Sequence, residues 1–247
     1  MDADFGGKRM INQVSQLADE QATAARDGRL SILPRPPAAS GAVGPQSLGL
    51  GTARDGWLYV PASYDSSQPA PLLVFLHGAG GSAQRGRRLF QFIANRTGLL
   101  VVTPESRGRT WDRIRGSFGA DVMFIEQALT RTFTSYAVDL SHMAIAGFSD
   151  GASYALALGL TNGDLFTHII ALSPGFAAPG NQHGRPRLFI THGTRDTVLP
   201  IDRCSRRIVP HLRAAGYDVQ YREFGGPHII QPWIAWAAIR WFMLTPR

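Results

Sequence analysis

Short apolar runs alternate with longer segments of helical spacing through most of the chain. The runs have the length of buried strands, and the segments between them repeat apolar positions at intervals of three and four residues. The apolar runs are Leu72–Leu76, Leu99–Thr103, Met143–Ala146, Ile169–Leu172 and Leu188–Thr191. The helical segments fall near residues 85–97, 121–136, 150–162 and 201–215. Strands that alternate with helices predict an α/β protein with a parallel sheet and helices on both faces.

Further strands are predicted at both ends of this pattern. Ser47–Leu50 and Trp57–Val60 flank Arg54-Asp55-Gly56, and Asp-Gly between apolar runs favours a hairpin. Val219–Phe224 adds a last strand, and an amphipathic helix follows over Ile229–Phe242. We therefore expect a mostly parallel sheet of roughly eight strands.

The first 45 residues have a different character. A loose helical pattern over Met10–Arg26 ends at Asp27-Gly28, where glycine favours the left-handed cap. Pro34–Pro45 is too rich in proline and glycine for regular structure and reads as an extended connector. We expect an N-terminal helix and connector at residues 1–45 and one catalytic domain at residues 46–247.

Composition excludes several classes of protein. With 44% apolar and 17% charged residues, the chain is neither disordered nor a coiled coil. No window approaches the ~18 consecutive apolar residues of a membrane span. Cys204 is the only cysteine, which rules out an intramolecular disulfide and a CxxC metal site. No apolar signal segment follows Lys8 and Arg9, so a cytoplasmic location is expected.

The charge of +7 raises the question of an anionic partner. Only Lys8 is lysine and all other basic residues are arginine, which is typical of a compositional bias toward arginine. The arginine triplets are short and separated, and no basic helix or aromatic-rich strand accompanies them. The triplets are Arg85, Arg87, Arg88 and Arg203, Arg206, Arg207. Nucleic acid is therefore not expected as a partner.

Reactive groups in such sheets gather at the carboxyl ends of the parallel strands. Gly147-Phe148-Ser149-Asp150-Gly151 follows one strand and precedes a small-residue helix, which is the GxSxG pattern of a nucleophilic serine on a sharp turn. Glycines two positions before and after Ser149 remove side chains that would clash there. Ser149 is the predicted nucleophile.

A serine hydroxyl needs a histidine base and a carboxylate that orients it. Asp196 lies in the loop after the next-to-last strand, and His228 lies in Gly225-Gly226-Pro227-His228 after the last one. The chain order is serine, acid, histidine. His192 is an alternative base, although its place before Gly193 suits a structural role.

Backbone amides are expected to bind the developing oxyanion. One is the amide of Asp150, and the other is that of Ala79 in Phe75-Leu76-His77-Gly78-Ala79-Gly80-Gly81, with Gly80 as the alternative. His77 is expected to brace this loop rather than act as the base. The reaction requires no metal or cofactor.

These motifs together resemble the α/β-hydrolase esterases over about residues 46–243. The resemblance is strongest to the small phospholipase/carboxylesterase and polyhydroxybutyrate-depolymerase-like branch. Thr110-Trp111-Asp112 also resembles the T-W-D of depolymerase- and feruloyl-esterase-like members. The resemblance implies a serine carboxylesterase with Ser149, Asp196 and His228 as triad and the Ala79 and Asp150 amides as oxyanion hole.

Only Gly175–Arg187 separates two strands where lid domains of this superfamily usually enter, so an open site without a lid is expected. Short- to medium-chain esters are the expected small-molecule substrates. Trp111, Phe176 and Trp233 are predicted pocket walls. Four arginines near the mouth are potential ligands for an anionic acid group: Arg107, Arg109, Arg113 and Arg115.

Other functions remain open at this stage. The same triad serves acyltransferases, thioesterases and serine peptidases, because an acyl-enzyme is open to attack by nucleophiles other than water. A non-catalytic binding member of the fold is a more remote alternative. The sequence leaves the oligomeric state undetermined.

Overall fold

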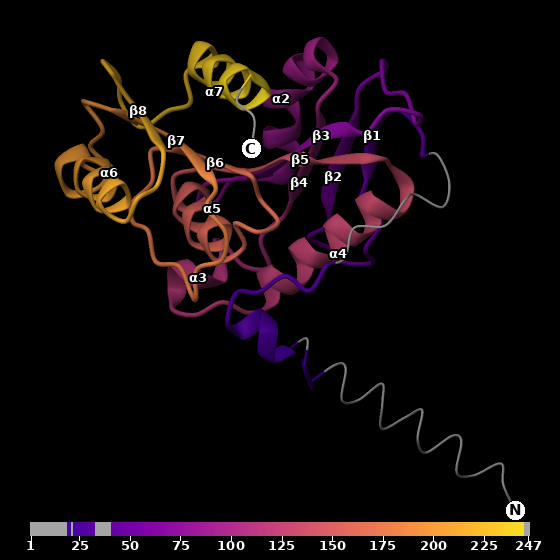
Figure 1. Ribbon diagram of the computed structural model, residues 1–247, viewed down its shortest axis with the longest axis horizontal. Coiled ribbons are helices and arrows are strands. Elements are labelled where there is room, and N and C mark those ends of the chain that lie inside the picture. The colour runs from indigo at the N-terminus through magenta and orange to yellow at the C-terminus, as the bar shows by residue number, and fades with distance from the viewer. Residues whose placement is uncertain (1–18, 21, 33–40, 245–247) are drawn as a thin grey trace, which may run out of the picture.

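The computed structural model describes residues 19–20, 22–32 and 41–244, which form one eight-stranded sheet between two layers of helices (Figure 1). The strands are β1 (Gly44–Ser47), β2 (Gly56–Val60), β3 (Ala70–Leu76), β4 (Leu100–Pro104), β5 (Val138–Phe148), β6 (His168–Leu172), β7 (Arg187–Gly193) and β8 (Val219–Phe224). Their order in the sheet is β1-β2-β4-β3-β5-β6-β7-β8. β2 pairs antiparallel with β1 and β4, and all other neighbours are parallel. The predicted mostly parallel sheet is confirmed.

Helices cover both faces of the sheet, as expected. They are α2 (Ala83–Thr97), α3 (Asp112–Arg115), α4 (Ala120–Ser135), α5 (Asp150–Thr161), α6 (Ser205–Ala214) and α7 (Pro232–Leu244), with a 3-10 turn over Ile201–Arg203. In Figure 1, α2 and α7 lie above the sheet and α4, α5 and α6 lie below it. The short helix α3 is absent from the sequence prediction, because its four residues bury none of their side chains.

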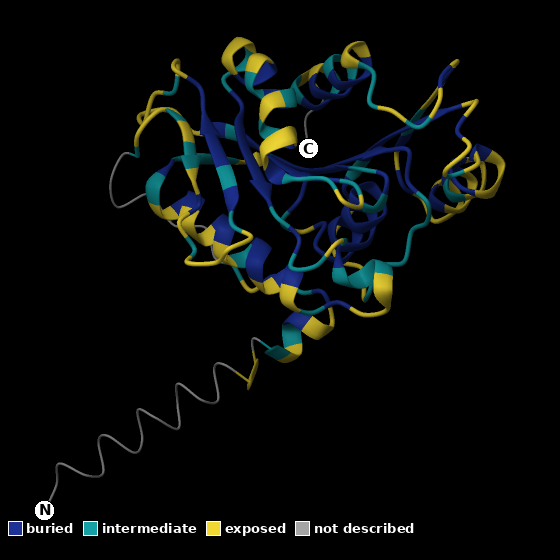
Figure 2. Ribbon diagram, turned by 180° about the vertical axis from the view of Figure 1, so that it is seen from behind, coloured by how far each residue is buried: buried dark blue, intermediate teal, exposed yellow. Residues whose placement is uncertain are grey.

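Alternate residues of the central strands supply two separate cores. In β3, Leu72 and Val74 pack with α4 and α5, whereas Leu73 and Phe75 pack with α2 and α7. Figure 2 shows the strands and α5 as a continuous buried layer, with exposed positions on the outer helices. A strand that is buried on both faces reads as a continuous apolar run, which is why the sequence predicted these strands well.

The first strand lies three residues earlier than predicted. β1 covers Gly44–Ser47, so it begins inside the expected connector, and it pairs with β2. Pro45 is tolerated there because β1 is an edge strand, where a missing N–H costs no ladder bond. Asp55 is not part of a two-residue turn; its carboxylate accepts hydrogen bonds from the Ser47 hydroxyl and the Gly49 amide and organises a wider loop.

The described N-terminal residues pack on the sheet domain. Residues 22–26 are helical, and Gly28 has φ 77°, which confirms the left-handed cap. Leu30 is buried in the core and donates its N–H to Asn162 at 3.0 Å, while Arg29 pairs with Asp164 at 2.9 Å. The start of the predicted helix and residues 34–40 of the connector lie outside the described residues. The division at residues 45 and 46 stays a prediction.

The connection between β6 and β7 contains no helix, so the expected absence of a lid domain agrees with the fold of the described residues. The last helix begins at Pro232 rather than Ile229, because proline is favoured at the first helical position. The loops after β3, β4, β5, β7 and β8 all open at the carboxyl edge of the parallel strands, where the predicted site residues lie.

Candidate active site

Ser149 lies at the sharp turn between β5 and α5. Its backbone has φ 57° and ψ −123°, a conformation that residues with a side chain rarely adopt. A Cβ on Gly147 would lie 2.1 Å from the Gly151 carbonyl oxygen, and one on Gly151 would lie 2.2 Å from the Leu76 carbonyl oxygen. Only glycine fits at both positions, so the predicted strand–turn–helix setting is present.

The loops after β7 and β8 bring Asp196 and His228 to this serine. His228 Nε2 lies 2.9 Å from the Ser149 hydroxyl oxygen, and His228 Nδ1 lies 2.5 Å from Asp196 Oδ2. An ionised carboxylate only accepts hydrogen bonds, so Nδ1 carries the proton. Nε2 is therefore the acceptor for the Ser149 hydroxyl.

Asp196 is held as a carboxylate. Its side chain is fully buried, and its Oδ1 accepts N–H groups of Val198 and Leu199 at 2.9 and 2.8 Å. Burial acts to raise the pKa of Asp196, but the hydrogen bonds from Leu199 and His228 outweigh it and lower the pKa below its usual value. The group stays ionised at neutral pH and holds the His228 ring in one orientation.

His192, the alternative base, lies beside the triad carboxylate, with its Nε2 3.2 Å from Asp196 Oδ2, and makes two shorter contacts. Its Nε2 lies 2.7 Å from the Leu199 carbonyl oxygen, and its Nδ1 lies 2.7 Å from the Ser205 hydroxyl. A carbonyl only accepts, so Nε2 donates and Nδ1 accepts the Ser205 hydroxyl. Burial lowers the pKa of His192 and favours this neutral form. The geometry supports the structural role expected for His192.

The loop between β3 and α2 lies against Ser149. A Cβ on Gly78 would come within 3.2 Å of the Ser149 Cβ. The N–H groups of Ala79 and Asp150 have no acceptor among the described residues, whereas the Gly80 N–H donates to the Arg109 carbonyl at 3.0 Å. Of the two amides considered in this loop, only that of Ala79 is therefore available to a ligand.

His77 fixes the peptide that carries the Ala79 N–H. His77 Nε2 accepts the Ser106 N–H at 3.2 Å, so Nδ1 carries the proton and donates to the Gly78 carbonyl at 2.8 Å. Burial lowers the pKa of His77 and keeps the ring neutral. The Gly78 carbonyl and the Ala79 N–H belong to one planar trans peptide and point in opposite directions. His77 thus orients the N–H, the bracing role expected for it.

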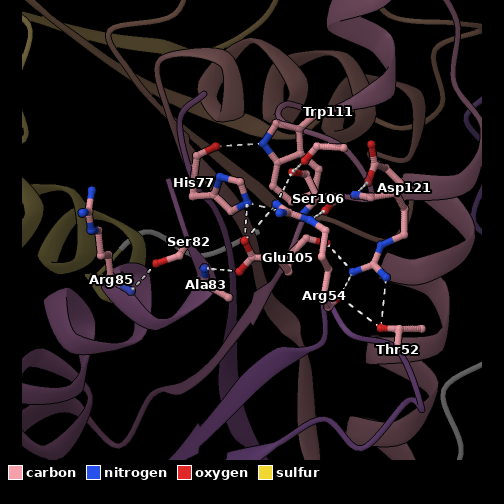
Figure 3. Close-up of polar contacts among 12 residues, drawn as sticks. Thr52, Arg54, His77, Ser82, Ala83, Arg85, Glu105, Ser106, Trp111 and Asp121 are labelled. Carbon is pink, nitrogen blue, oxygen red and sulfur yellow. Dashed lines mark hydrogen bonds and ion pairs between the residues drawn. The ribbon is translucent and has the colours of Figure 1, made fainter. Parts of the chain in front are cut away.

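The loop after β4 supports His77 from behind (Figure 3). The Trp111 indole N–H donates to the His77 carbonyl at 2.8 Å, and Glu105 accepts the Ala83 N–H at 2.6 Å. Arg54 pairs with Glu105 at 3.0 Å and donates to the Ser106 carbonyl at 2.5 Å. These bonds connect the loops after β3 and β4 to one another and to the β1–β2 loop that carries Arg54.

One buried carboxylate, Asp121, and one half-buried carboxylate, Asp112, anchor the other end of this loop. Asp121 accepts N–H groups of Arg107 and Asp112 at 2.5 and 2.7 Å, and Asp112 accepts the Asp121 N–H and the Tyr154 hydroxyl at 2.8 and 2.9 Å. Burial raises the pKa of Asp121 to about 6, and the nearby Asp112 adds to the rise. The folded protein therefore binds a proton here more tightly than the unfolded chain does.

We expect this proton to make folding stability depend on pH. A folded pKa of about 6 against an ordinary 3.8 means that the contribution of Asp121 to stability increases as pH falls from 6 toward 4, by up to about 3 kcal/mol. Asp121→Asn removes this titration. The free energy of unfolding from urea titrations across pH 4–7 is expected to differ in slope between the two proteins; parallel curves would contradict this assignment.

Two of the three predicted pocket walls do not serve as such. Trp111 is completely buried and packs on His77 and Tyr154, so it supports the site from within the core. Trp233 is 55% exposed at the start of α7 and packs edge-on against Phe224, within a surface groove that contains Arg222 and Arg240. An aromatic residue near a motif in sequence need not line the site, because its direction depends on tertiary packing.

Phe176 is better placed than the other two aromatics. It is half-buried, and its N–H lies 3.4 Å from the hydroxyl of Ser153, which is one turn after Ser149 on α5. Its role as a pocket wall stays a prediction.

A cavity of about 280 Å³, here named the α2 pocket, lies beside the turn that carries Ser149, because its lining includes Gly78 and Phe148. Its lining includes Ala79 of the β3–α2 loop, Leu89 of α2, Ile230 and Phe148. The centroids of the Phe148 and His228 rings are 4.7 Å apart. Sequence reasoning missed these apolar lining residues, because Leu89 and Phe148 look like ordinary core positions of a helix and a strand. Arg85 also lines the pocket.

The four arginines after β4 have divided roles. The Arg107 guanidinium donates to the Glu105 carbonyl and lies over the Phe124 ring, and that of Arg113 donates to Ala178 and Gly116 carbonyls. Arg107 and Arg113 therefore hold loops together. Arg109 and Arg115 are exposed, and none of the four lines the α2 pocket.

Within the described part of the chain, no group of three or more His, Cys, Asp or Glu side chains is arranged to hold a metal ion. No helix of that part has the length and apolar character to cross a membrane.

The family model and the curated proteins that this chain resembles are all described as esterases. The family described as "Putative esterase" matches residues 47–197, more than half of the chain. Probable feruloyl esterase C of Aspergillus oryzae and feruloyl esterase C of Emericella nidulans are each 27% identical over 157 residues, covering 60% of this chain and 57% of theirs. The chain thus spans less than two thirds of the length of these curated relatives.

Solved structures agree on the fold. Esterase PE8 superposes with a TM-score of 0.62 at 22% identity, over 75% of this chain and 97% of that one. A ferulic acid esterase of Anaeromyces mucronatus superposes with 0.61 at 16% identity, over 83% and 92%. These similarities establish the α/β-hydrolase fold. Together with the family match, they show that the chain belongs to this esterase family.

Proposed function

We propose that the protein is a serine carboxylesterase with Ser149 as nucleophile, His228 as base and Asp196 as the residue that orients the base. The observation that carries the proposal is the continuous hydrogen-bond chain from Ser149 through His228 to Asp196. These two hydrogen bonds place His228 Nε2, in the tautomer that can accept a proton, next to the weakly acidic hydroxyl of Ser149. The similarity to feruloyl esterases supports the same reaction class.

The roles follow from the geometry. His228 Nε2 takes the proton of the Ser149 hydroxyl as its oxygen attacks the ester carbonyl, and the protonated ring is stabilised by Asp196. His228 then gives that proton to the departing alkoxide, which leaves an acyl group on Ser149. A water molecule, deprotonated by the same nitrogen, hydrolyses the acyl-enzyme and releases the acid.

Ala79 and Asp150 supply the oxyanion hole in this proposal. Both N–H groups lack an acceptor among the described residues, and both belong to segments that contact Ser149. Each such donor is typically worth about 2.7–4 kcal/mol of transition-state stabilisation. A preorganised pair, held by His77 and by the start of α5, requires little reorganisation during the reaction.

His77→Ala is expected to lower kcat by about tenfold or more with little change in KM, because an oxyanion contact is stronger in the transition state than in the ground state. His77→Asn places an amide N–H near the position of Nδ1 and is expected to recover part of kcat. His77→Gln replaces Nε2 instead and is expected to recover less. Equal losses in the Asn and Gln variants at matched melting temperature would argue against the role of the Gly78 bond.

Short- to medium-chain carboxylic esters are the substrate class that the site favours. The α2 pocket, at about 280 Å³, lies just below the usual range of ligand pockets, and the β6–β7 connection contains no helix that would form a lid. Because the relatives are named feruloyl esterases, methyl ferulate belongs in the panel of test substrates. The cytoplasmic location expected from the sequence is part of the proposal, and the single free thiol of Cys204 is compatible with it.

Labelling with a fluorophosphonate probe tests the proposed function. The probe is expected to modify the intact protein on the peptide that contains Ser149, as located by mass spectrometry, and to leave heat-unfolded protein unmodified. Hydrolysis of a p-nitrophenyl ester series then measures the preferred acyl length, and added methanol reveals any transfer to alcohols. Failure of the folded protein both to label and to hydrolyse would reject the proposal.

A further inference from the structure

Arg85 is the only charged side chain among the described residues that line the α2 pocket. It lies in the first turn of α2, where its N–H is capped by the Ser82 hydroxyl at 3.4 Å. The pocket is otherwise formed by glycines and by apolar or neutral residues, and it extends from Ala79 to Leu89 and Ile230. A ligand in this pocket therefore meets apolar surface and one cation.

The guanidinium group of Arg85 has no hydrogen-bond or ion-pair partner among the described residues. It is exposed, and Figure 3 shows it extending away from the Glu105 carboxylate. Glu105 is already occupied by Arg54 at 3.0 Å and by the Ala83 N–H at 2.6 Å. The half-buried Glu105 carboxylate is thus already paired with another arginine, and the charge of Arg85 is available to a ligand.

The lining of the pocket includes residues that lie next to the proposed reaction centre, since a Cβ on Gly78 would come within 3.2 Å of the Ser149 Cβ. Phe148 precedes Ser149, and Ala79 carries one of the two free amides. An ester whose carbonyl lies at Ser149 has two arms, and the pocket offers one of them the apolar side chains of Leu89 and Ile230 and the guanidinium of Arg85. A planar guanidinium recognises a carboxylate through paired N–H donors.

We infer that the site selects esters that carry a free carboxylate on the arm bound in the α2 pocket, with Arg85 as the specificity-determining residue. This inference rests on the proposed esterase function and adds its substrate class. It also moves the anion-binding role from the arginines after β4 to α2.

Matched ester pairs test the inference. In the first pair, the mono-4-nitrophenyl ester of glutaric acid is compared with its analogue that has a neutral carboxamide in place of the free carboxylate. In the second pair, the charge lies on the leaving group instead, as in acetyl esters of 4-hydroxybenzoate and 4-hydroxybenzamide. The measured quantity is the ratio of kcat/KM for the anionic ester to that for the neutral ester, within one protein. The two pairs distinguish the acid arm from the alcohol arm.

We expect a ratio above one in at least one pair, up to about fivefold, which is the strength measured for exposed ion pairs. Arg85→Gln is expected to bring that ratio to about one, and Arg85→Lys to retain part of the preference. Arg88→Gln, an exposed arginine on the same helix that does not line the pocket, serves as control and is expected to keep the wild-type ratio. The preference should shrink between about 0.01 and 1 M ionic strength, as the Debye length falls from about 30 to 3 Å.

A wild-type ratio at or below one in both pairs overturns the inference while neutral-ester hydrolysis leaves the proposed function intact. A ratio that is equally high in wild type and in Arg85→Gln also overturns it, because the preference then has another source. If the wild-type protein hydrolyses neither member of either pair, the proposed function fails and the inference fails with it.

Discussion

We expect Ser149→Ala to lower kcat/KM for a short p-nitrophenyl ester by about 10⁵-fold or more, because removal of a nucleophile from such a triad abolishes the acyl-enzyme route. The His228 ring and the free amides of Ala79 and Asp150 remain in the variant, so binding of the ester is retained while the covalent step is lost. Initial rates at several substrate concentrations, with enzyme in excess where necessary, measure the effect.

Folding of the Ser149→Ala variant is expected to be close to wild type. Alanine and serine experience the same backbone strain at φ 57°, and the change removes only the hydroxyl that contacts His228. Circular dichroism and the melting temperature check this point. Ser141→Ala, an exposed position near the start of β5, is the matched control and should keep full activity. Substantial hydrolysis by a folded Ser149→Ala protein would falsify the assignment of the nucleophile.

The second large effect is expected for Gly151→Ala. The new methyl group would lie 2.2 Å from the Leu76 carbonyl oxygen and 2.5 Å from that of His77, both of them backbone atoms. Relief requires β3 and α5 to move apart, which disturbs the tightly packed centre of the sheet. We expect a loss of at least about 3 kcal/mol in the free energy of unfolding, at the upper end of overpacking effects.

Activity should fall together with stability in this variant, because displacement of His77 also displaces the Ala79 amide. Urea denaturation and soluble yield measure stability, and the p-nitrophenyl assay measures activity on the folded fraction. Gly225→Ala is the control: a Cβ there meets nothing within 4 Å, so its stability should stay within about 0.5 kcal/mol of wild type. A Gly151→Ala protein as stable and active as this control would show that the turn tolerates a side chain.

Sequence patterns predicted the central strands and helices well but were weaker at the edges of the fold. β3, β4, β6 and β7 are buried on both faces and therefore appear as uninterrupted apolar runs. β1 has an alternation of half-buried and exposed residues and includes Pro45, so its position could not be distinguished from a connector. β5 begins with half-buried and exposed residues, among them the polar Asp139 and Ser141, so the predicted strand was shorter than the observed one.

The pocket was harder to predict than the triad. Ser149, Asp196 and His228 each follow a strand, and parallel strands bring their carboxyl ends to one edge whatever the details of packing. Trp111 and Arg85 both lie in or close to the sequence motifs of the site. Trp111 is buried beneath the site, whereas Arg85 lines the α2 pocket. Their directions depend on how the β3–α2 loop and the loop after β4 contact each other, which local sequence patterns do not encode.

The sequence by itself determined the layered sheet, the glycine-flanked turn and the order of the three proposed triad residues, because these depend on hydrophobic periodicity and on local backbone geometry. Only the tertiary structure decided that the Ala79 amide is free while that of Gly80 is bonded to Arg109, and that His77 acts through the Gly78 carbonyl. Those outcomes rest on hydrogen bonds between the loops after β3 and β4, which are distant along the chain and meet only when neighbouring parallel strands align their ends.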